Sequence, residues 1–251
     1  MRFTDRSDAG RQLGARLREM GLELPVIYAL PRGGVPVAIE IAKALGAPLD
    51  LLLVRKIGAP GAPELAIGAV AEGAPPGTVR NSEIMAHAGA DDAFFTRAQQ
   101  HELKEMERRR ALYLQGRERI SPAGRTAIIV DDGLATGATA KAALDALRRQ
   151  GAAKTVLAVP VAPVDTLAEM AAHADHTVCL YPARRFHGVG SFYDDFHQLT
   201  DEETIGLLRE AWAGEVQPAD PAAALLRREV TIPPHGLGAD LCLPFSPRNT
   251  C

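Results

Sequence analysis

The chain has 251 residues, of which 47% are hydrophobic and 24% charged, with a formal net charge of -3 at pH 7. This composition is typical of a globular protein, and the slight negative charge gives no support to a nucleic-acid partner. No run approaches the roughly 20 apolar residues of a membrane span, and the three cysteines show neither metal-ligand spacing nor a disulfide framework, so we expect a cytoplasmic protein without a membrane partner.

Strand and helix patterns alternate along the chain, which predicts an α/β fold with a mostly parallel, twisted sheet and helices on both faces. Short apolar runs indicate buried strands, and longer amphipathic stretches indicate helices. In chain order we predict a helix at Asp8–Met20, a strand at Val26–Leu30, a helix at Val35–Leu45, a strand at Leu49–Val54, a helix at Asp91–Gly116, a strand at Ala127–Val130, a helix at Ala138–Gln150, and strands at Thr155–Val161 and His176–Leu180.

Three segments of the first half stand out. The turn Pro31-Arg32-Gly33-Gly34 lies between a predicted strand and a predicted helix. The basic pair Arg55–Lys56 follows the next strand, and the Gly/Pro-rich stretch Gly58–Glu64 predicts a mobile loop. The basic run Arg108–Arg110 falls in the long helix, where a solvated face is a better interpretation than a nucleic-acid patch.

The strand Ala127–Val130 leads into two adjacent carboxylates, Asp131 and Asp132, and then into a loop rich in Gly and Thr. The following helix presents unpaired N–H groups and the positive end of its dipole, and these bind a phosphate. Thr136 and Thr139 add hydroxyl donors. Carboxylates accept hydrogen bonds from sugar hydroxyls, so the stretch predicts a site for a sugar phosphate with a diol beside the phosphate.

The stretch Val130-Asp-Asp-Gly-Leu-Ala-Thr-Gly-Ala-Thr139 resembles the phosphoribosyl-pyrophosphate (PRPP) loop of type I phosphoribosyltransferases. The resemblance covers roughly Arg2 to Trp212 and is strongest at two phosphate loops. It implies that Asp131 and Asp132 hold the ribose hydroxyls as catalytic residues. It also implies a 5′-phosphate site made of Gly133, Ala135, Thr136, Gly137, Ala138 and Thr139.

The same resemblance gives roles to the earlier loops. Pro31, Arg32, Gly33 and Gly34 correspond to a loop that binds pyrophosphate through backbone amides and often contains a non-proline cis peptide, here Pro31–Arg32. Arg32 is the implied cation near the leaving group. Lys56 is a candidate pyrophosphate contact, although a solvated basic pair at a strand end explains it equally well.

The segment Tyr181–Phe196 resembles the hood that covers the base in purine phosphoribosyltransferases, and we place the hood at about residues 181–200. Phe186 and Val189 are the implied acceptor contacts, and Asp194 and Asp195 the implied magnesium contacts. An amphipathic capping segment with core aromatics is an equally good interpretation. Enzymes that use 6-oxopurines usually carry a Lys after the preceding strand, whereas Val159-Pro-Val-Ala-Pro163 has none, so the acceptor stays open.

Two domains are predicted: a phosphoribosyltransferase-like domain at 1–213 and a tail at 214–251. In the tail, Leu226–Pro234 and Leu237–Pro244 indicate a short hairpin after a linker. This hairpin resembles the start of a dienelactone hydrolase-like domain, which is fused to some bacterial phosphoribosyltransferase domains, but no Gly-x-Ser-x-Gly nucleophile follows. A simple C-terminal hairpin is the alternative.

The resemblance implies an Mg²⁺-dependent, cytoplasmic and homodimeric enzyme. It would transfer the 5-phosphoribosyl group of PRPP to a nitrogen nucleophile of a small-molecule acceptor, of the nucleobase class, and release pyrophosphate. The alternative is a non-catalytic protein that binds PRPP or a nucleotide for regulation. A regulator of this kind would keep the PRPP loop and lack an acceptor site.

Overall fold

A computed structural model describes residues 2–73 and 75–213 of the chain. All of these residues belong to one unit, Met1–Pro218, and the other unit, Ala219–Cys251, lies outside the described part. The predicted linker and C-terminal hairpin therefore also lie outside it. None of the helices in the described part is long and apolar enough to cross a membrane.

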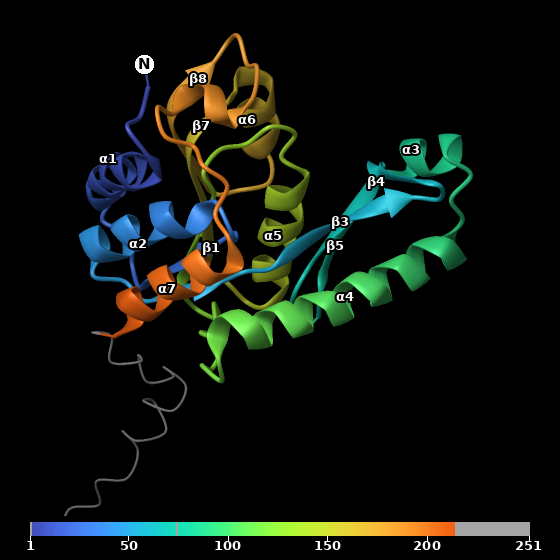
Figure 1. Cartoon of the computed structure of the whole chain (residues 1–251), viewed down its shortest axis with the longest axis horizontal. Coiled ribbons are helices and arrows are strands. Elements are labelled where there is room, and N and C mark those ends of the chain that lie inside the picture. Colours follow the sequence, from blue (N-terminus) through green and yellow to red (C-terminus); the bar gives the residue numbers. More distant parts are fainter. Residues whose placement is uncertain (1, 74, 214–251) are drawn as a thin grey trace, which may run out of the picture. The chain divides into compact units, whose positions relative to one another are not determined.

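Five parallel strands form the central sheet, in the order β2-β1-β6-β7-β8 (Figure 1). This arrangement confirms the predicted α/β class with a mostly parallel sheet. The predicted strands are all present, although β2 ends earlier than expected. The strands are β1 (Pro25–Ala29), β2 (Leu49–Leu51), β6 (Thr126–Val130), β7 (Lys154–Pro163) and β8 (His176–Ala183).

Helices cover both faces of this sheet because alternate strand residues point to opposite sides. Ile27 and Ile128 belong to a core on one face, and Tyr28 and Ile129 belong to a second core on the other. Strands buried on both faces need continuous apolar runs, which is what the sequence provides. The first face carries α1 (Arg6–Arg18), α2 (Gly34–Leu45) and α7 (Asp201–Trp212), and the second carries α5 (Ala138–Arg149) and α6 (Val164–Met170).

Between β2 and β6 the chain builds a second sheet, which is antiparallel and has the order β3-β4-β5 (Figure 1). We call residues 54–114 the arm. Five elements form it: β3 (Val54–Ala59), β4 (Ala62–Ala71), β5 (Gly77–Arg80), α3 (Ser82–His87) and α4 (Asp92–Leu114). Of these, only the long helix α4 was predicted.

The predicted loop at Gly58–Glu64 is wrong, because this stretch is the tip of the β3–β4 hairpin. Gly61 adopts a left-handed conformation (φ 69°) in the turn, where glycine has no steric penalty. A Cβ on Gly58 would lie 2.5 Å from the carbonyl oxygen of Pro63, so glycine also permits the close, irregular pairing there. Arg55 and Lys56 consequently lie within β3 and not at the end of a strand of the central sheet.

The arm packs on α5 through residues with little bulk. Ala69 and Ala71 of β4 contact Ala142 and Ala146 of α5 in a small apolar cluster. A Cβ on Gly77 would lie 2.5 Å from the carbonyl oxygen of Ala142. Small side chains therefore allow the second sheet to approach the helix that begins at the predicted phosphate loop.

A buried ion cluster connects the arm to the central sheet. Arg110 of α4 contacts Asp50 of β2 at 3.1 Å and Glu72 at 2.6 Å, and all three side chains are less than 10% exposed. Arg119 contacts the other oxygen of Glu72 at 3.0 Å. Burial raises the pKa of Glu72, while the charge of Arg110 opposes this increase. The cluster ties α4 and the end of β4 to an edge strand of the central sheet.

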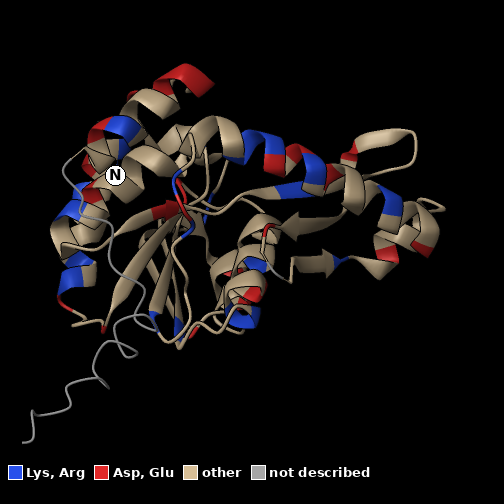
Figure 2. Ribbon diagram, turned by 90° about the horizontal axis from the view of Figure 1, so that it is seen from below, with Lys and Arg blue, Asp and Glu red and all other residues tan. Residues whose placement is uncertain are grey.

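The predicted solvated face at Arg108–Arg110 is therefore wrong for Arg110. Acidic and basic segments alternate along the long helix (Figure 2), as expected for a helix with one solvated side. Arg108 lies on that side and pairs with Glu105 at 2.8 Å, with two thirds of its side chain exposed. Arg110 follows two residues later, about 200° further around the helix, and points inward.

Replacing Arg110 should strongly destabilise the protein. Arg110→Gln would leave Glu72 and Asp50 buried without their cation, which costs about 3–5 kcal/mol in buried pairs of this kind. The matched change Arg108→Gln on the exposed face should alter the free energy of unfolding by no more than about 0.5 kcal/mol. Urea denaturation followed by circular dichroism measures both. Equal effects of the two variants would contradict a structural role for the buried cluster.

Candidate functional site

The loop after β6 lies at the carboxyl edge of the central sheet, beside the end of β1. The N–H of Leu30 donates to the carbonyl oxygen of Val130 at 2.9 Å. Helix α5 begins after Gly137, which is left-handed (φ 72°), and no side chain caps it. Its first N–H groups are thus open to an anion. This loop and the first turn contain all six residues predicted for the 5′-phosphate: Gly133, Ala135, Thr136, Gly137, Ala138 and Thr139.

A second loop, Pro31–Gly34, lies directly against the first. Its peptide bond Pro31–Arg32 is cis, as the resemblance implied. A Cβ on Gly33 would collide with the Asp132 carboxylate, and one on Gly34 would lie 2.5 Å from the carbonyl oxygen of Val130. Glycine at both positions therefore allows the two loops to meet.

Asp132 is held by Arg6, a residue that the sequence analysis missed. The Arg6 Nε donates to Asp132 Oδ2 at 2.8 Å, and the two side chains are only 9% and 14% exposed. Arg6 also donates to the carbonyl oxygen of His197 at 3.0 Å and lies 3.9 Å from the ring centroid of Phe196. An arginine at the start of a distant helix gives no local signal of this contact.

Side chains of the predicted hood contact the backbone of the loop after β6 next to Asp132. The hydroxyl of Tyr193 donates to the carbonyl oxygen of Asp132 at 2.6 Å. A Cβ on Gly133 would lie 2.6 Å from Val189 Cγ1. The structure therefore brings one predicted acceptor residue, Val189, against Gly133 of the loop after β6.

The two carboxylates have unusual protonation behaviour. Burial raises the pKa of Asp131 well above its usual value, and the charge of Asp132 raises it further. Burial also raises the pKa of Asp132, while the hydrogen bond from Arg6 opposes the increase. Asp131 accepts a hydrogen bond from the N–H of Asp132 at 2.9 Å. Ligand hydroxyls or a divalent cation would supply the partners that Asp131 lacks among the described side chains.

The predicted cations take different positions. Arg32 is about one third exposed and lies 3.9 Å from Asp201 Oδ1.

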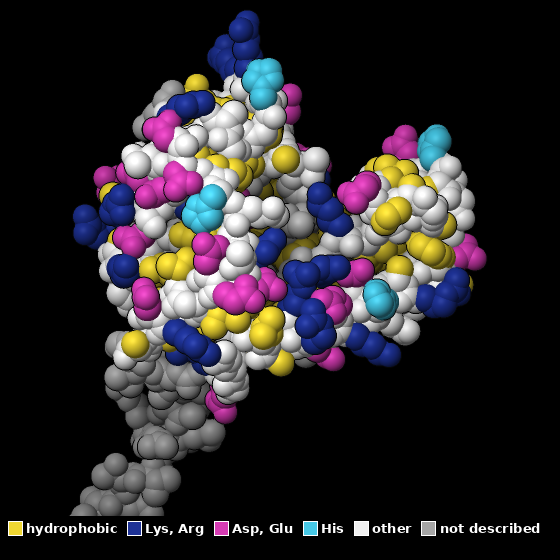
Figure 3. Space-filling model, in the orientation of Figure 1, with side chains coloured by type: hydrophobic (Ala, Val, Ile, Leu, Met, Phe, Trp, Pro, Cys, Tyr) yellow, Lys and Arg dark blue, Asp and Glu magenta, His cyan; other side chains and the backbone are white. Residues whose placement is uncertain are grey.

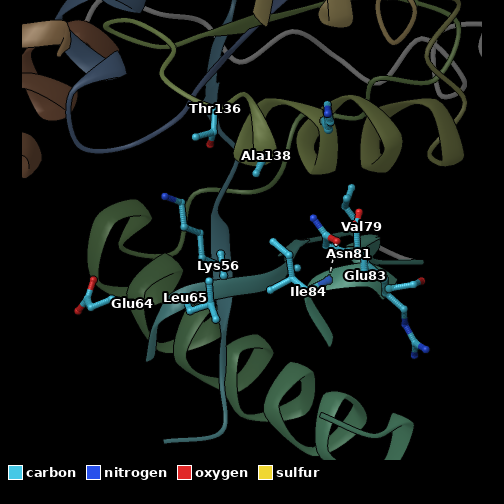
Figure 4. Close-up of a pocket in the computed structure, with 14 residues that line it drawn as sticks. Lys56, Glu64, Leu65, Val79, Asn81, Glu83, Ile84, Thr136 and Ala138 are labelled. Atoms are coloured by element: carbon cyan, nitrogen blue, oxygen red, sulfur yellow. Dashed lines mark hydrogen bonds between the residues drawn. The ribbon is translucent and has the colours of Figure 1, made fainter. Parts of the chain in front are cut away.

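Lys56 is exposed on β3 and, with Thr136 and Ala138, lines a cleft of about 670 Å³ between the arm and the start of α5 (Figure 4). The space-filling view shows a hollow between the body and the arm, with Lys and Arg side chains on its rim (Figure 3). Folding thus brings Lys56 and the predicted phosphate loop to the same cleft.

Aromatic side chains of the hood pack mainly on one another. Phe186 stacks on Phe192 with ring centroids 5.8 Å apart, and Tyr193 stacks on Phe196 at 5.0 Å. These rings belong to a cluster around the 3-10 helix η1 (Val189–Phe192). At least one face of Phe186 is therefore occupied by protein.

Asp194 and Asp195 lie on the exposed side of the hood. Asp194 pairs with Arg2 at 3.2 Å, and Asp195 pairs with His197 at 3.2 Å. A hydrogen bond from the His197 N–H lowers the pKa of Asp195. Within residues 2–73 and 75–213, no three or more His, Cys, Asp or Glu side chains are grouped to hold a metal ion. A metal role for the two aspartates stays a prediction.

A family model described as a phosphoribosyl transferase domain matches residues 7–193. The chain belongs to the phosphoribosyltransferase family. Two similar proteins of Mycobacterium tuberculosis, named "Putative phosphoribosyl transferase" MT0597 and Rv0571c, are each 44% identical over 252 residues, which cover 98% of this chain and 56% of theirs. The chain therefore spans about half the length of the curated relatives it matches. The crystal structure of TT1426 from Thermus thermophilus is 40% identical, with a TM-score of 0.72, and covers 84% of this chain and 99% of that one.

Removing the Asp131 charge should stabilise the free protein at neutral pH. A carboxyl whose pKa is raised on folding binds more protons in the folded state than in the unfolded state. Its ionisation therefore lowers the free energy of unfolding increasingly as the pH rises. We expect Asp131→Asn to raise Tm near pH 7.5 by about 2–4 °C, the shift that about 1 kcal/mol produces in a chain of this size.

The gain should shrink toward pH 4, where Asp131 is increasingly protonated in the wild-type protein. Calorimetric melting across this pH range measures the effect, with the exposed Asp165→Asn as a control. A lower Tm for Asp131→Asn at pH 7.5 would contradict the raised pKa.

Proposed function

We propose that this protein transfers the 5-phosphoribosyl group of PRPP to a ring nitrogen of a small acceptor of the nucleobase class, with release of pyrophosphate. One observation carries the proposal. The paired carboxylates Asp131 and Asp132, the uncapped start of α5 and the Pro31–Gly34 loop meet at one edge of the sheet. Such a site matches a diol that lies between two phosphorylated groups.

In this proposal each part of PRPP has its own partner. Asp131 and Asp132 accept hydrogen bonds from the ribose hydroxyls. Backbone amides of residues 133–139, with the Thr136 and Thr139 hydroxyls, hold the 5′-phosphate. The amides of the Pro31–Gly34 loop hold the pyrophosphate, and Arg32 and Lys56 add positive charge.

The reaction is a displacement at ribose C1. A lone pair of the acceptor nitrogen forms a bond to C1 while the bond from C1 to the pyrophosphate oxygen breaks, and the oxygen keeps the electron pair. The acceptor nitrogen then loses its proton to water or to the released pyrophosphate. Arg32 and the loop amides stabilise charge on the leaving group, and the Asp131–Asp132 pair lies near the positive charge that develops on the sugar.

The residues present fit a magnesium ion bound together with PRPP. Mg²⁺ is usually held by one or two carboxylates and by phosphate oxygens of the substrate. Asp131 and Asp132 supply such oxygens at the ribose, and the predicted contacts Asp194 and Asp195 would have to leave Arg2 and His197. When bound, the ion would neutralise charge on the leaving pyrophosphate.

Further parts of the proposal rest on the sequence. We propose cytoplasmic action as a homodimer, with PRPP and a small molecule as ligands. We also retain the proposal that the domain is of the bacterial kind fused to a dienelactone hydrolase-like domain. That proposal depends on the hairpin at Leu226–Pro244, which lies outside the described residues.

A non-catalytic regulator that binds PRPP or a nucleotide is the second candidate. The packing of Phe186 on Phe192 favours it, because this ring is less available to stack on an acceptor than the resemblance implied. The two candidates share the PRPP loop and differ in whether an acceptor site exists.

PRPP binding tests both candidates together. With Mg²⁺ present, calorimetry should detect PRPP binding by the wild-type protein. The double variant Asp131→Asn and Asp132→Asn should bind at least about 100-fold more weakly, because two charge-assisted contacts to the ribose are lost. Circular dichroism checks that the variant is folded, and Asp165→Asn serves as a matched control.

A pyrophosphate-release assay over a panel of nucleobases separates the candidates. Release with one base establishes a transferase and names its acceptor. PRPP binding without release from any base favours the regulator. Unchanged PRPP affinity in the double variant, or no binding by the wild type, would refute the site.

Arg6 should control the pH dependence of the reaction. Arg6→Gln removes the cation that opposes the increase in the Asp132 pKa, so more Asp132 is protonated at a given pH. We expect a higher KM for PRPP and an acidic limb of kcat/KM that moves to higher pH. Arg16→Gln, which removes an exposed arginine of the same helix, is the control. A pH profile identical to wild type would exclude this positioning role.

A further inference from the structure

Helix α6 contacts the loop after β6 through a side-chain hydrogen bond. The helix follows β7 without a connecting residue, since β7 ends at Pro163 and α6 begins at Val164. The Thr166 hydroxyl donates to the carbonyl oxygen of Ala135 at 2.9 Å. Thr166 lies 31 positions after Ala135 and outside the Gly/Thr-rich stretch that predicted the phosphate site. A residue of α6 therefore holds the backbone of this loop.

Two further contacts keep α6 against the loop and the start of α5. A Cβ on Gly137 would lie 3.0 Å from Met170 Cε and 3.3 Å from Thr166 Cγ2, so the helix packs directly on this glycine. Glu169 pairs with Lys141, which lies one turn into α5. These contacts fix the distance between α6 and the loop. The Thr166 hydroxyl adds a contact that depends on the direction of a peptide group.

The hydrogen bond from Thr166 sets the orientation of the peptide unit between Ala135 and Thr136. A carbonyl oxygen can only accept, so the hydroxyl is the donor in this contact. The peptide is trans, because Pro31–Arg32 is the only cis bond in the described part of the chain. In a planar trans peptide the C=O and the N–H point in opposite directions. The N–H of Thr136 therefore points away from α6.

This orientation matters because the loop keeps several backbone donors open. The N–H of Leu134 is used within the protein and donates to the carbonyl oxygen of Val161 at 2.9 Å. The N–H groups of Ala135, Thr136 and Gly137 donate to no acceptor among the described residues. A reversed Ala135–Thr136 peptide would place a carbonyl oxygen where a donor now lies, and a carbonyl dipole repels a phosphate. The Thr166 contact thus holds the loop in its anion-binding form.

We infer that Thr166 is a positioning residue for the sugar-phosphate end of the substrate. It acts through the Ala135 carbonyl, without contact to the ligand, and its ligand class is a sugar that carries a 5′-phosphate. The inference rests on the proposed transferase function, whose displacement at C1 it leaves unchanged. Pyrophosphate, which we assign to the Pro31–Gly34 loop, should bind independently of it.

Two variants of Thr166 separate the hydroxyl from the rest of the side chain. Thr166→Val removes the donor and keeps the branched shape, whereas Thr166→Ser keeps the donor. Calorimetry would give the Kd of each protein for ribose 5-phosphate and, with Mg²⁺, for PRPP and pyrophosphate. We expect Thr166→Val to bind ribose 5-phosphate and PRPP about fivefold to tenfold more weakly, the effect of one lost hydrogen bond. Thr166→Ser should bind both ligands as the wild type does.

The pyrophosphate measurement distinguishes positioning from a general structural role. Its Kd should be the same in Thr166→Val and the wild type, because damage to the whole site would weaken both ligands together. Asp165→Asn, a change at the adjacent exposed residue of α6, is the matched control and should leave every Kd unchanged. Melting followed by circular dichroism checks that each variant is folded.

Three results would overturn the inference. The first is wild-type affinity of Thr166→Val for ribose 5-phosphate and PRPP. The second is an equal loss of affinity in Thr166→Val and Thr166→Ser, since the hydroxyl would then not be responsible. The third is a parallel loss of pyrophosphate affinity in Thr166→Val. If the wild type itself binds neither ribose 5-phosphate nor PRPP, the proposed function fails, which is a different outcome from all three.

Discussion

The ion pair between Arg6 and Asp132 is the contact on which the arrangement of the site depends. Two charges that are nearly removed from water are stable together only with close geometry and further hydrogen bonds. Here the Nε–Oδ2 distance is 2.8 Å, and Arg6 also binds the carbonyl oxygen of His197. One guanidinium therefore joins helix α1, residues Phe196 and His197, and the loop after β6. Glycine at positions 33 and 34 then lets the Pro31–Gly34 loop approach the same aspartate.

The carboxylate pair lowers the stability of the free protein. Asp131 and Asp132 follow one another at the end of a buried strand, so burial and their mutual repulsion both disfavour two negative charges. The positive charge of Arg6 stabilises the negative charge of Asp132. Asp131 has no such cation among the described residues, and a strongly raised pKa of this kind is common at functional sites.

The arm differs from the central sheet in what holds it in place. Its sheet meets α5 through alanine and glycine, which bury little surface per residue but allow close approach. At its base, the cluster of Arg110, Asp50 and Glu72 adds directional contacts in a buried setting. Together these contacts position Lys56 of β3 across the cleft from the start of α5. The hood, by contrast, uses its aromatic rings to pack on itself and on Arg6.

The sequence by itself determined the features that depend on neighbouring residues. The apolar run Ala127–Val130, the acidic pair and the glycines of both loops predicted the parallel sheet and the resemblance to the family. That resemblance in turn implied the cis bond at Pro31–Arg32. Local patterns failed where the deciding partner is distant. Gly58–Glu64 forms a hairpin because β4 pairs with β3, Arg110 is buried because Glu72 and Asp50 receive it, and Arg6 reaches Asp132 across 126 positions of the chain. Only the tertiary structure decided these contacts, because their energies arise from burial and charge between segments that folding brings together.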